Sequence, residues 1–140
     1  MRQILLFAAL AASLALLSGF ALSRAKEGKA EDMTDKAAYQ KISAEEAYEM
    51  RASQEVVVVD VRTREEYDGG HIENAVLVPN ESIGSEMPDA LPDKEATLLV
   101  YCRSGRRSKD AAQKLLALGY QSVYDFGGVI DWPYELVKER

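Results

Sequence analysis

The sequence contains one cysteine, Cys102, and one histidine, His71, among its 140 residues. A single cysteine cannot form a disulfide within the chain, which excludes a disulfide-stapled scaffold. One cysteine and one histidine also cannot supply the four ligands of a zinc finger. No Asp-rich loop with the spacing of a calcium site occurs in the sequence. We therefore expect no metal site.

Positive charge is also scarce, because 17 Lys and Arg residues face 23 Asp and Glu residues, for a net charge of −6. Nucleic-acid binding that ignores base sequence depends on neutralising phosphates, so an acidic chain is a poor candidate for it. The chain is nevertheless 47% hydrophobic and 29% charged, which is typical of a folded protein. Its length leaves room for one domain of ordinary size.

The long uncharged run of the sequence lies near its start, at residues 4–22, with Arg2 before it and Arg24 after it. A basic start, an apolar stretch and small residues at its end describe a secretory signal. The run is also just long enough to span a bilayer as a helix. We therefore expect residues 1–23 to be a signal peptide or an N-terminal membrane anchor, and the protein to be exported to the periplasm or the cell exterior. Residues 24–36 are polar and lack apolar periodicity, which predicts a flexible tether before a folded domain at residues 37–140.

The folded part alternates between strand-like and helix-like patterns. Runs of β-branched and leucine residues predict buried strands. The expected strands are residues 39–42, 56–61, 75–78, 97–101 and 122–126. Helices are predicted from Ser43, where Glu46 completes a capping box, and from alanines and leucines at helical spacing. The expected helical segments are residues 44–52, 64–67, 82–87, 108–118 and 131–139, with a turn at Gly127 and Gly128. Such alternation predicts an α/β fold with a small parallel β-sheet flanked by helices on both faces.

The single cysteine follows the buried strand at residues 97–101, at the sheet edge where open α/β folds bind ligands. After it come Arg103, Ser104, Gly105, Arg106, Arg107 and Ser108, and then a helix. Successive backbone N–H groups in such a loop can converge on an anion, and the helix N-terminus adds the positive end of its dipole. These groups and the arginines favour thiolate over thiol, so we expect a depressed pKa for Cys102. The alternative is a buried structural cysteine, against which the three neighbouring arginines argue.

The loop resembles the active-site loop of a known family. Tyrosine-type phosphatases place an arginine six positions after the cysteine, whereas Ser108 stands there in this chain. The shorter loop suits a single sulfur atom, and CRSGRRS resembles the loop of single-domain rhodaneses. Residues 59–79 are similar to the D-V-R, E-Y, G-H-I and V-P pattern of that family, and Gly127-Gly128 with Trp132 to its closing G-G and W. The resemblance covers about residues 42–136, with Asn74 where glycine is common and Asp131-Trp132-Pro133 in place of the usual A-W end.

The resemblance implies a rhodanese-like domain and a thiosulfate sulfurtransferase-like enzyme. Cys102 would take sulfur from thiosulfate or a similar small anionic donor, carry it as a persulfide, and pass it to cyanide or a thiol acceptor. No cofactor is implied. Residues 103–108 would bind the donor anion, although Arg107 could instead brace the loop against a carboxylate. The alternatives are a rhodanese-fold binding or sensing module without turnover, and a cysteine phosphatase or arsenate-reductase-like enzyme.

Three polar residues are expected to support the loop. Asp60 would accept hydrogen bonds from backbone or arginine donors and hold the loop architecture. Arg62 would pair with a carboxylate such as Glu66, or else contact the substrate. A lone histidine without a second ligand is more often structural than catalytic, so His71 is expected to be hydrogen-bonded framework. We expect a monomer that contacts no nucleic acid, and a membrane only through an uncleaved N-terminal segment.

Overall fold

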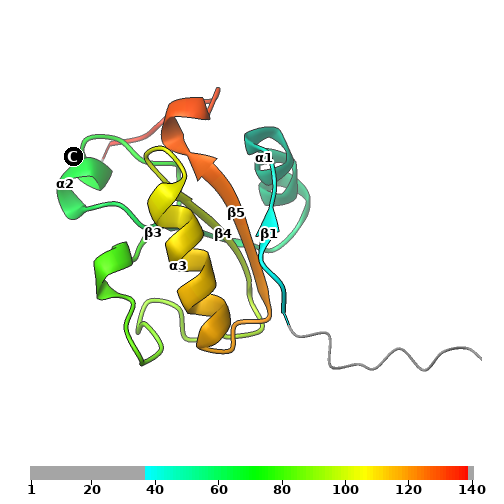
Figure 1. Ribbon diagram of the computed structural model, residues 1–140. Coiled ribbons are helices and arrows are strands. Elements are labelled where there is room, and N and C mark those ends of the chain that lie inside the picture. The colour runs from blue at the N-terminus through cyan, green and yellow to red at the C-terminus, as the bar shows by residue number, and fades with distance from the viewer. Residues whose placement is uncertain (1–36, 139–140) are drawn as a thin grey trace, which may run out of the picture. The chain divides into compact units, whose positions relative to one another are not determined.

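The computed structural model describes residues 37–138, so the expected leader and tether lie outside the described residues. Five strands form one sheet in the order β1-β5-β4-β2-β3, with every neighbouring pair parallel (Figure 1). The strands are β1 (Gln40–Lys41), β2 (Val57–Asp60), β3 (Val76–Leu77), β4 (Thr97–Cys102) and β5 (Ser122–Gly128). The helices are α1 (Ala44–Ser53), α2 (Arg64–Asp68) and α3 (Arg106–Ala117), with two 3₁₀ turns, η1 (Asn80–Ser82) and η2 (Val129–Asp131). The predicted parallel α/β fold is confirmed.

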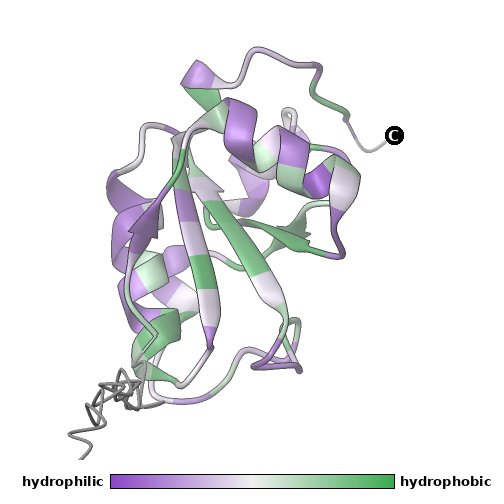
Figure 2. Ribbon diagram, turned by 90° about the vertical axis from the view of Figure 1, so that its right-hand side faces the viewer, coloured by the Kyte–Doolittle hydropathy of each residue, from purple (hydrophilic) through white to green (hydrophobic). Residues whose placement is uncertain are grey.

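The sheet separates two hydrophobic cores, because successive strand residues point to opposite faces. In β4, Leu98, Val100 and Cys102 belong to the core that α3 covers, whereas Leu99 and Tyr101 belong to the core that α1 covers. All five are at most 1% exposed. In Figure 2 the hydrophobic, green stretches lie mainly along the strands, whereas the helices are largely purple. Within residues 37–138, no helix combines the length and apolarity needed to cross a membrane.

Helix caps explain where the two helices on the α1 side begin. The predicted capping box at Ser43 and Glu46 is confirmed, since each side chain binds the other residue's backbone N–H. Thr63 and Glu66 form a second capping box in front of α2. Such reciprocal bonds satisfy two backbone donors that a helix start leaves unpaired. They place α2 directly after β2, at the same sheet edge as Cys102.

Three local predictions are wrong. The helix predicted at residues 131–139 is absent over 131–138, where Asp131 ends η2 and Val137 pairs with His71 as an isolated antiparallel bridge; residue 139 lies outside the described residues. The expected helix at residues 82–87 does not form, since only Ser82 of that segment belongs to η1 and Gly84 within it disfavours helix. Gly127 and Gly128 do not form a separate turn but end strand β5.

Candidate active site

Cys102 is the last residue of β4, and its side chain is held at the start of α3. The thiol is 1% exposed, and the backbone N–H of Gly105 donates to its sulfur at 3.0 Å. Gly105 has φ 99°, a left-handed conformation that glycine adopts without steric cost, and α3 begins at the next residue. The helix therefore starts two residues earlier than predicted, which brings its first backbone N–H groups close to the sulfur.

The loop favours the ionised form of this cysteine. Burial by itself would raise the pKa of the Cys102 thiol, but hydrogen bonds from Ser108, Gly105 and Ser104 outweigh it, so that the pKa is lowered. The positive end of the α3 dipole acts in the same direction. A lowered pKa increases the share of thiolate at a given pH, and the thiolate is the nucleophilic form of cysteine.

The three arginines of the loop divide into two kinds. Arg107 makes a bidentate ion pair with Glu66, with N–O distances of 2.7 and 2.8 Å. This pair holds the pKa of Glu66 at about 2, well below the usual value. The side chains of Arg103 and Arg106 are exposed and make no hydrogen bond or salt bridge within the described residues, although Arg106 lies near enough to Asp110 to help lower the pKa of that carboxyl. Two arginines thus remain open to an anion, while Arg107 braces the loop against α2.

A cavity of about 700 Å³ opens beside the loop. It is lined by Asn80, Glu81, Arg103, Ser104, Arg106, Arg107 and Asp110. Asp110 is engaged by Lys114 and Asn80, each at 2.9 Å, so its charge is compensated locally. The exposed guanidinium groups of Arg103 and Arg106 therefore bring positive charge to this opening.

Asp60, Arg62 and Tyr101 form a buried network under the loop. Nε and Nη2 of Arg62 donate to the Asp60 carboxylate at 2.7–3.1 Å, and the Tyr101 hydroxyl donates to it at 2.6 Å. Nη2 of Arg62 also donates to the carbonyl of Gly70 at 2.8 Å. Arg62 therefore pairs with a carboxylate as predicted, but the partner is Asp60 and not the suggested Glu66, which pairs with Arg107.

His71 is a framework residue in this arrangement. Its side chain is buried, its ring stacks on Tyr67 with centroids 3.6 Å apart, and Nδ1 lies 2.9 Å from the carbonyl oxygen of Tyr67. Its backbone exchanges two hydrogen bonds with Val137. The histidine therefore ties the C-terminal segment to the end of α2.

Two residues of β5 that sequence reasoning missed also shape the loop. Asp125 is 1% exposed and accepts from the Ser108 hydroxyl at 2.7 Å and from the Gly127 N–H at 2.9 Å. Gly128 lies so close to the loop that an added Cβ would be 2.6 Å from Cα of Ser104. The sequence signal for Asp125 was an acidic residue inside a mostly apolar strand, where a charge needs hydrogen-bond partners.

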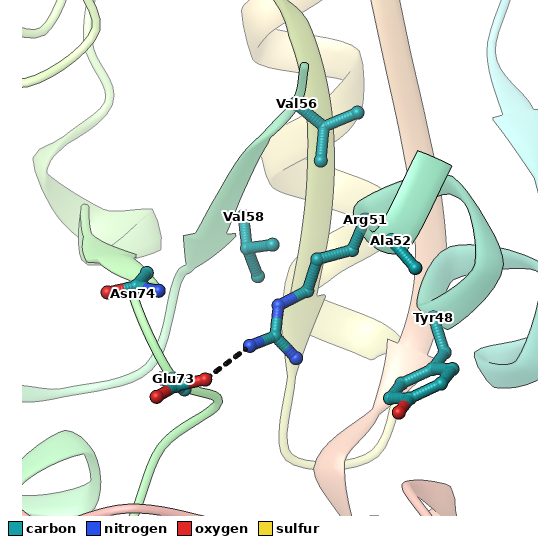
Figure 3. Close-up of a pocket in the computed structure, with 7 residues that line it drawn as sticks. All are labelled: Tyr48, Arg51, Ala52, Val56, Val58, Glu73 and Asn74. Carbon is teal, nitrogen blue, oxygen red and sulfur yellow. Dashed lines mark hydrogen bonds and ion pairs between the residues drawn. The ribbon is translucent and has the colours of Figure 1, made fainter. Parts of the chain in front are cut away.

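A second cavity, of about 420 Å³, lies on the α1 side of the sheet (Figure 3). Its lining residues are Tyr48, Arg51, Ala52, Val56, Val58, Glu73 and Asn74, and none belongs to the cysteine loop. Nη2 of Arg51 lies 2.9 Å from Oε2 of Glu73 across this cavity, and the two side chains neutralise each other's charge as an ion pair. Among residues 37–138, no cluster of three His, Cys, Asp or Glu side chains could hold a metal ion.

Fold and site together define an α/β domain that presents an activated cysteine at the carboxyl end of a central parallel strand. The model of the Rhodanese-like domain family matches residues 43–133. The chain belongs to this rhodanese-like domain family.

Individual relatives agree with this assignment. The thiosulfate sulfurtransferase PspE of Escherichia coli is 36% identical over 80 residues, which cover 57% of this chain and 77% of that protein. The tRNA uridine(34) hydroxylase of Hamiltonella defensa is 35% identical over 98 residues, or 66% of this chain but only 28% of the relative. A solved structure of a rhodanese with anions from Escherichia coli is 35% identical, with a TM-score of 0.54 over 59% of this chain and 98% of that chain.

Proposed function

We propose that this protein is a sulfurtransferase that carries sulfane sulfur on Cys102, from thiosulfate or a similar anionic donor to cyanide or a thiol acceptor. The observation that carries the proposal is the hydrogen bond of 3.0 Å from the Gly105 N–H to the Cys102 sulfur, in a loop that also lowers the pKa of the thiol. Similarity to the thiosulfate sulfurtransferase PspE supports the choice of chemistry.

The reaction proceeds in two displacements at sulfur. The Cys102 thiolate attacks the outer sulfur of thiosulfate, a new S–S bond forms, and sulfite leaves with the electron pair of the broken S–S bond. The acceptor then attacks the outer sulfur of the persulfide, and Cys102 departs as thiolate. With cyanide the product is thiocyanate. No net oxidation occurs, because the sulfane sulfur passes unchanged from donor to acceptor.

The loop residues have distinct roles in this mechanism. The Gly105 and Ser108 N–H groups stabilise the charge of the thiolate and of the persulfide, as an oxyanion hole stabilises oxygen. Arg103 and Arg106 attract the donor anion, because both side chains are exposed beside the loop and neither forms a hydrogen bond or salt bridge elsewhere in residues 37–138. Arg107 holds the loop in place through its pair with Glu66.

The similarity to a tRNA uridine hydroxylase covers 28% of that relative, so the proposal is confined to chemistry that the residues of this domain can perform. We propose that the reaction takes place after export, because the uncharged run at residues 4–22 has the pattern of a signal peptide or membrane anchor. With a single cysteine in the chain, no internal thiol can discharge the persulfide. The acceptor therefore comes from outside the protein, which we expect to act as a monomer without nucleic acid.

The proposal is tested by cyanide-dependent formation of thiocyanate from thiosulfate. Cys102→Ser is expected to abolish turnover, since the hydroxyl cannot carry sulfur. Arg106→Ala is expected to raise the KM for thiosulfate about tenfold, which corresponds to one charge-assisted hydrogen bond. The matched control is Arg64→Ala, an arginine that is likewise exposed and is paired with Asp68 on α2, and it should leave KM unchanged. Turnover that survives in Cys102→Ser would refute the assignment.

A further inference from the structure

Asp125 is a buried carboxylate that the proposed mechanism does not use. Asp125 lies in β5 and is 1% exposed. Its neighbour in β4 is Val100, which precedes Cys102 by two positions. Val123 belongs to the core under α3, so the alternation of the strand places Asp125 on the same face, toward the start of that helix. A buried charge of this kind persists only where several donors satisfy it.

The two oxygens of Asp125 serve different parts of the fold. Oδ1 accepts from the Ser108 hydroxyl at 2.7 Å and from the Gly127 N–H at 2.9 Å. Oδ2 accepts from the Tyr39 hydroxyl at 2.6 Å and pairs with Lys41 at 3.4 Å. Oδ1 therefore holds the first turn of α3 and the end of β5, whereas Oδ2 holds the edge around β1.

Ser108 connects this carboxylate to the cysteine. Its hydroxyl is 2.7 Å from Asp125, against 3.1 Å from the carbonyl of Gly105 and 3.3 Å from that of Gly127. Of these three acceptors the carboxylate is the nearest and the charged one, so it anchors Ser108 most strongly. Ser108 also contributes backbone and side-chain hydrogen bonds that lower the pKa of Cys102, so the carboxylate that anchors Ser108 helps to fix the donors around the sulfur.

We propose that Asp125 is a positioning residue that, by accepting the Ser108 hydroxyl, holds the first turn of α3 in place around the Cys102 sulfur. The proposal deepens the proposed function and rests on it, in that Cys102 is taken as the reacting group. Asp125 does not touch the substrate in this account. It acts through the position of the amides that stabilise the thiolate.

A positioning effect and a direct charge effect have opposite signs. The negative charge of Asp125 would by repulsion disfavour the Cys102 thiolate, although Lys41 offsets part of that charge. Arg107 is the charged side chain whose interaction with Cys102 favours the thiolate. If Asp125 acted by its charge alone, its removal would make Cys102 more acidic. If it acts by position, its removal makes Cys102 less acidic.

The test is the pH dependence of Cys102 alkylation by iodoacetamide, followed by intact mass. This readout needs no sulfur transfer, so a failure of this inference and a failure of the proposed function give different results. Asp125→Ala and Ser108→Ala are each expected to move the midpoint of the profile up by about one pH unit, and so to slow alkylation about tenfold at pH values below the wild-type midpoint. The double variant should be no slower than either single variant, because both remove the same contact.

Two variants separate position from charge and from folding. Asp125→Asn keeps an acceptor oxygen for Ser108, so it is expected to restore the wild-type profile. Tyr39→Phe removes a partner of Oδ2 only, and it should also leave the profile unchanged. Unchanged or faster alkylation in both alanine variants would overturn the proposal, as would an asparagine variant as slow as the alanine variant. If Asp125→Ala does not fold, the smaller change Ser108→Ala tests the proposal in its place. Slower alkylation then supports the proposal, and unchanged or faster alkylation overturns it.

Discussion

Replacing Gly128 with alanine is expected to damage the cysteine loop directly. Gly128 has φ −116° and ψ 145°, an extended conformation that any residue adopts, so backbone strain is not the reason for glycine here. The reason is space. An added Cβ would lie 2.6 Å from Cα of Ser104 and closer still to the carbonyl oxygen of Arg103, whereas side-chain carbons essentially never come within 3.0 Å. Because the obstructing atoms belong to the backbone, the loop itself has to move.

The expected cost of this substitution has two parts. Overpacking of this kind lowers the free energy of unfolding by about 1–3 kcal/mol. A displaced loop also loses the bond from the Gly105 N–H to the Cys102 sulfur, which measures 3.0 Å. A hydrogen bond to a charged group contributes about 1.5–3 kcal/mol, so the pKa of Cys102 should rise by about one to two units.

Denaturant unfolding and the pH profile of Cys102 alkylation measure the two parts separately. Gly84→Ala is the matched control, because a Cβ added there meets no atom within 4 Å. It should change the free energy of unfolding by less than about 0.5 kcal/mol and leave the alkylation profile as it is. If Gly128→Ala behaved like this control in both measurements, the close approach of β5 to the loop would not constrain the site.

Two further substitutions test the framework. Glu66 has a folded-state pKa of about 2, below its ordinary value of 4.5, so its pair with Arg107 stabilises the fold above pH 4.5 and loses this effect as the pH falls to 2. Glu66→Gln should therefore cost about 2 kcal/mol at pH 6, and the gap to wild type in urea unfolding should close by pH 2; a gap independent of pH would contradict this. Tyr101→Phe removes the hydroxyl that serves Asp60 and the Ile72 N–H, so it should cost about 1–3 kcal/mol of unfolding free energy with no shift in Cys102 alkylation; a shifted profile would mean that this network also tunes the thiol.

The central strands and the cysteine loop could be predicted from the sequence because their signals are local. Residues 98–100 are apolar at every position, and that pattern is typical of a strand covered on both faces. Cys102 follows the predicted strand directly, with glycine and arginines in the next five positions, so the end of the strand and the loop can be recognised together. The capping box at Ser43 is equally local, since it needs only two residues three positions apart.

The wrong predictions depend on contacts between residues far apart in the sequence. Residues 131–138 lack a helix because Trp132 packs on Phe126 and Val137 pairs with His71, and neither contact leaves a pattern within the segment. Several carboxylates lie near Arg62 in the sequence, so its partner Asp60, which is buried together with it, could not be singled out. Asp125 was overlooked because its partners come from three separate elements.

The most direct test of the central claim is the intact mass of the purified protein before and after treatment with thiosulfate. Transfer of one sulfur atom to Cys102 adds about 32 Da, and subsequent cyanide should remove it. The wild-type protein is expected to show this gain, and Cys102→Ala is expected to show none. An unchanged wild-type mass, in a sample whose Cys102 is alkylated readily at pH 7, would contradict the claim that this cysteine carries sulfur.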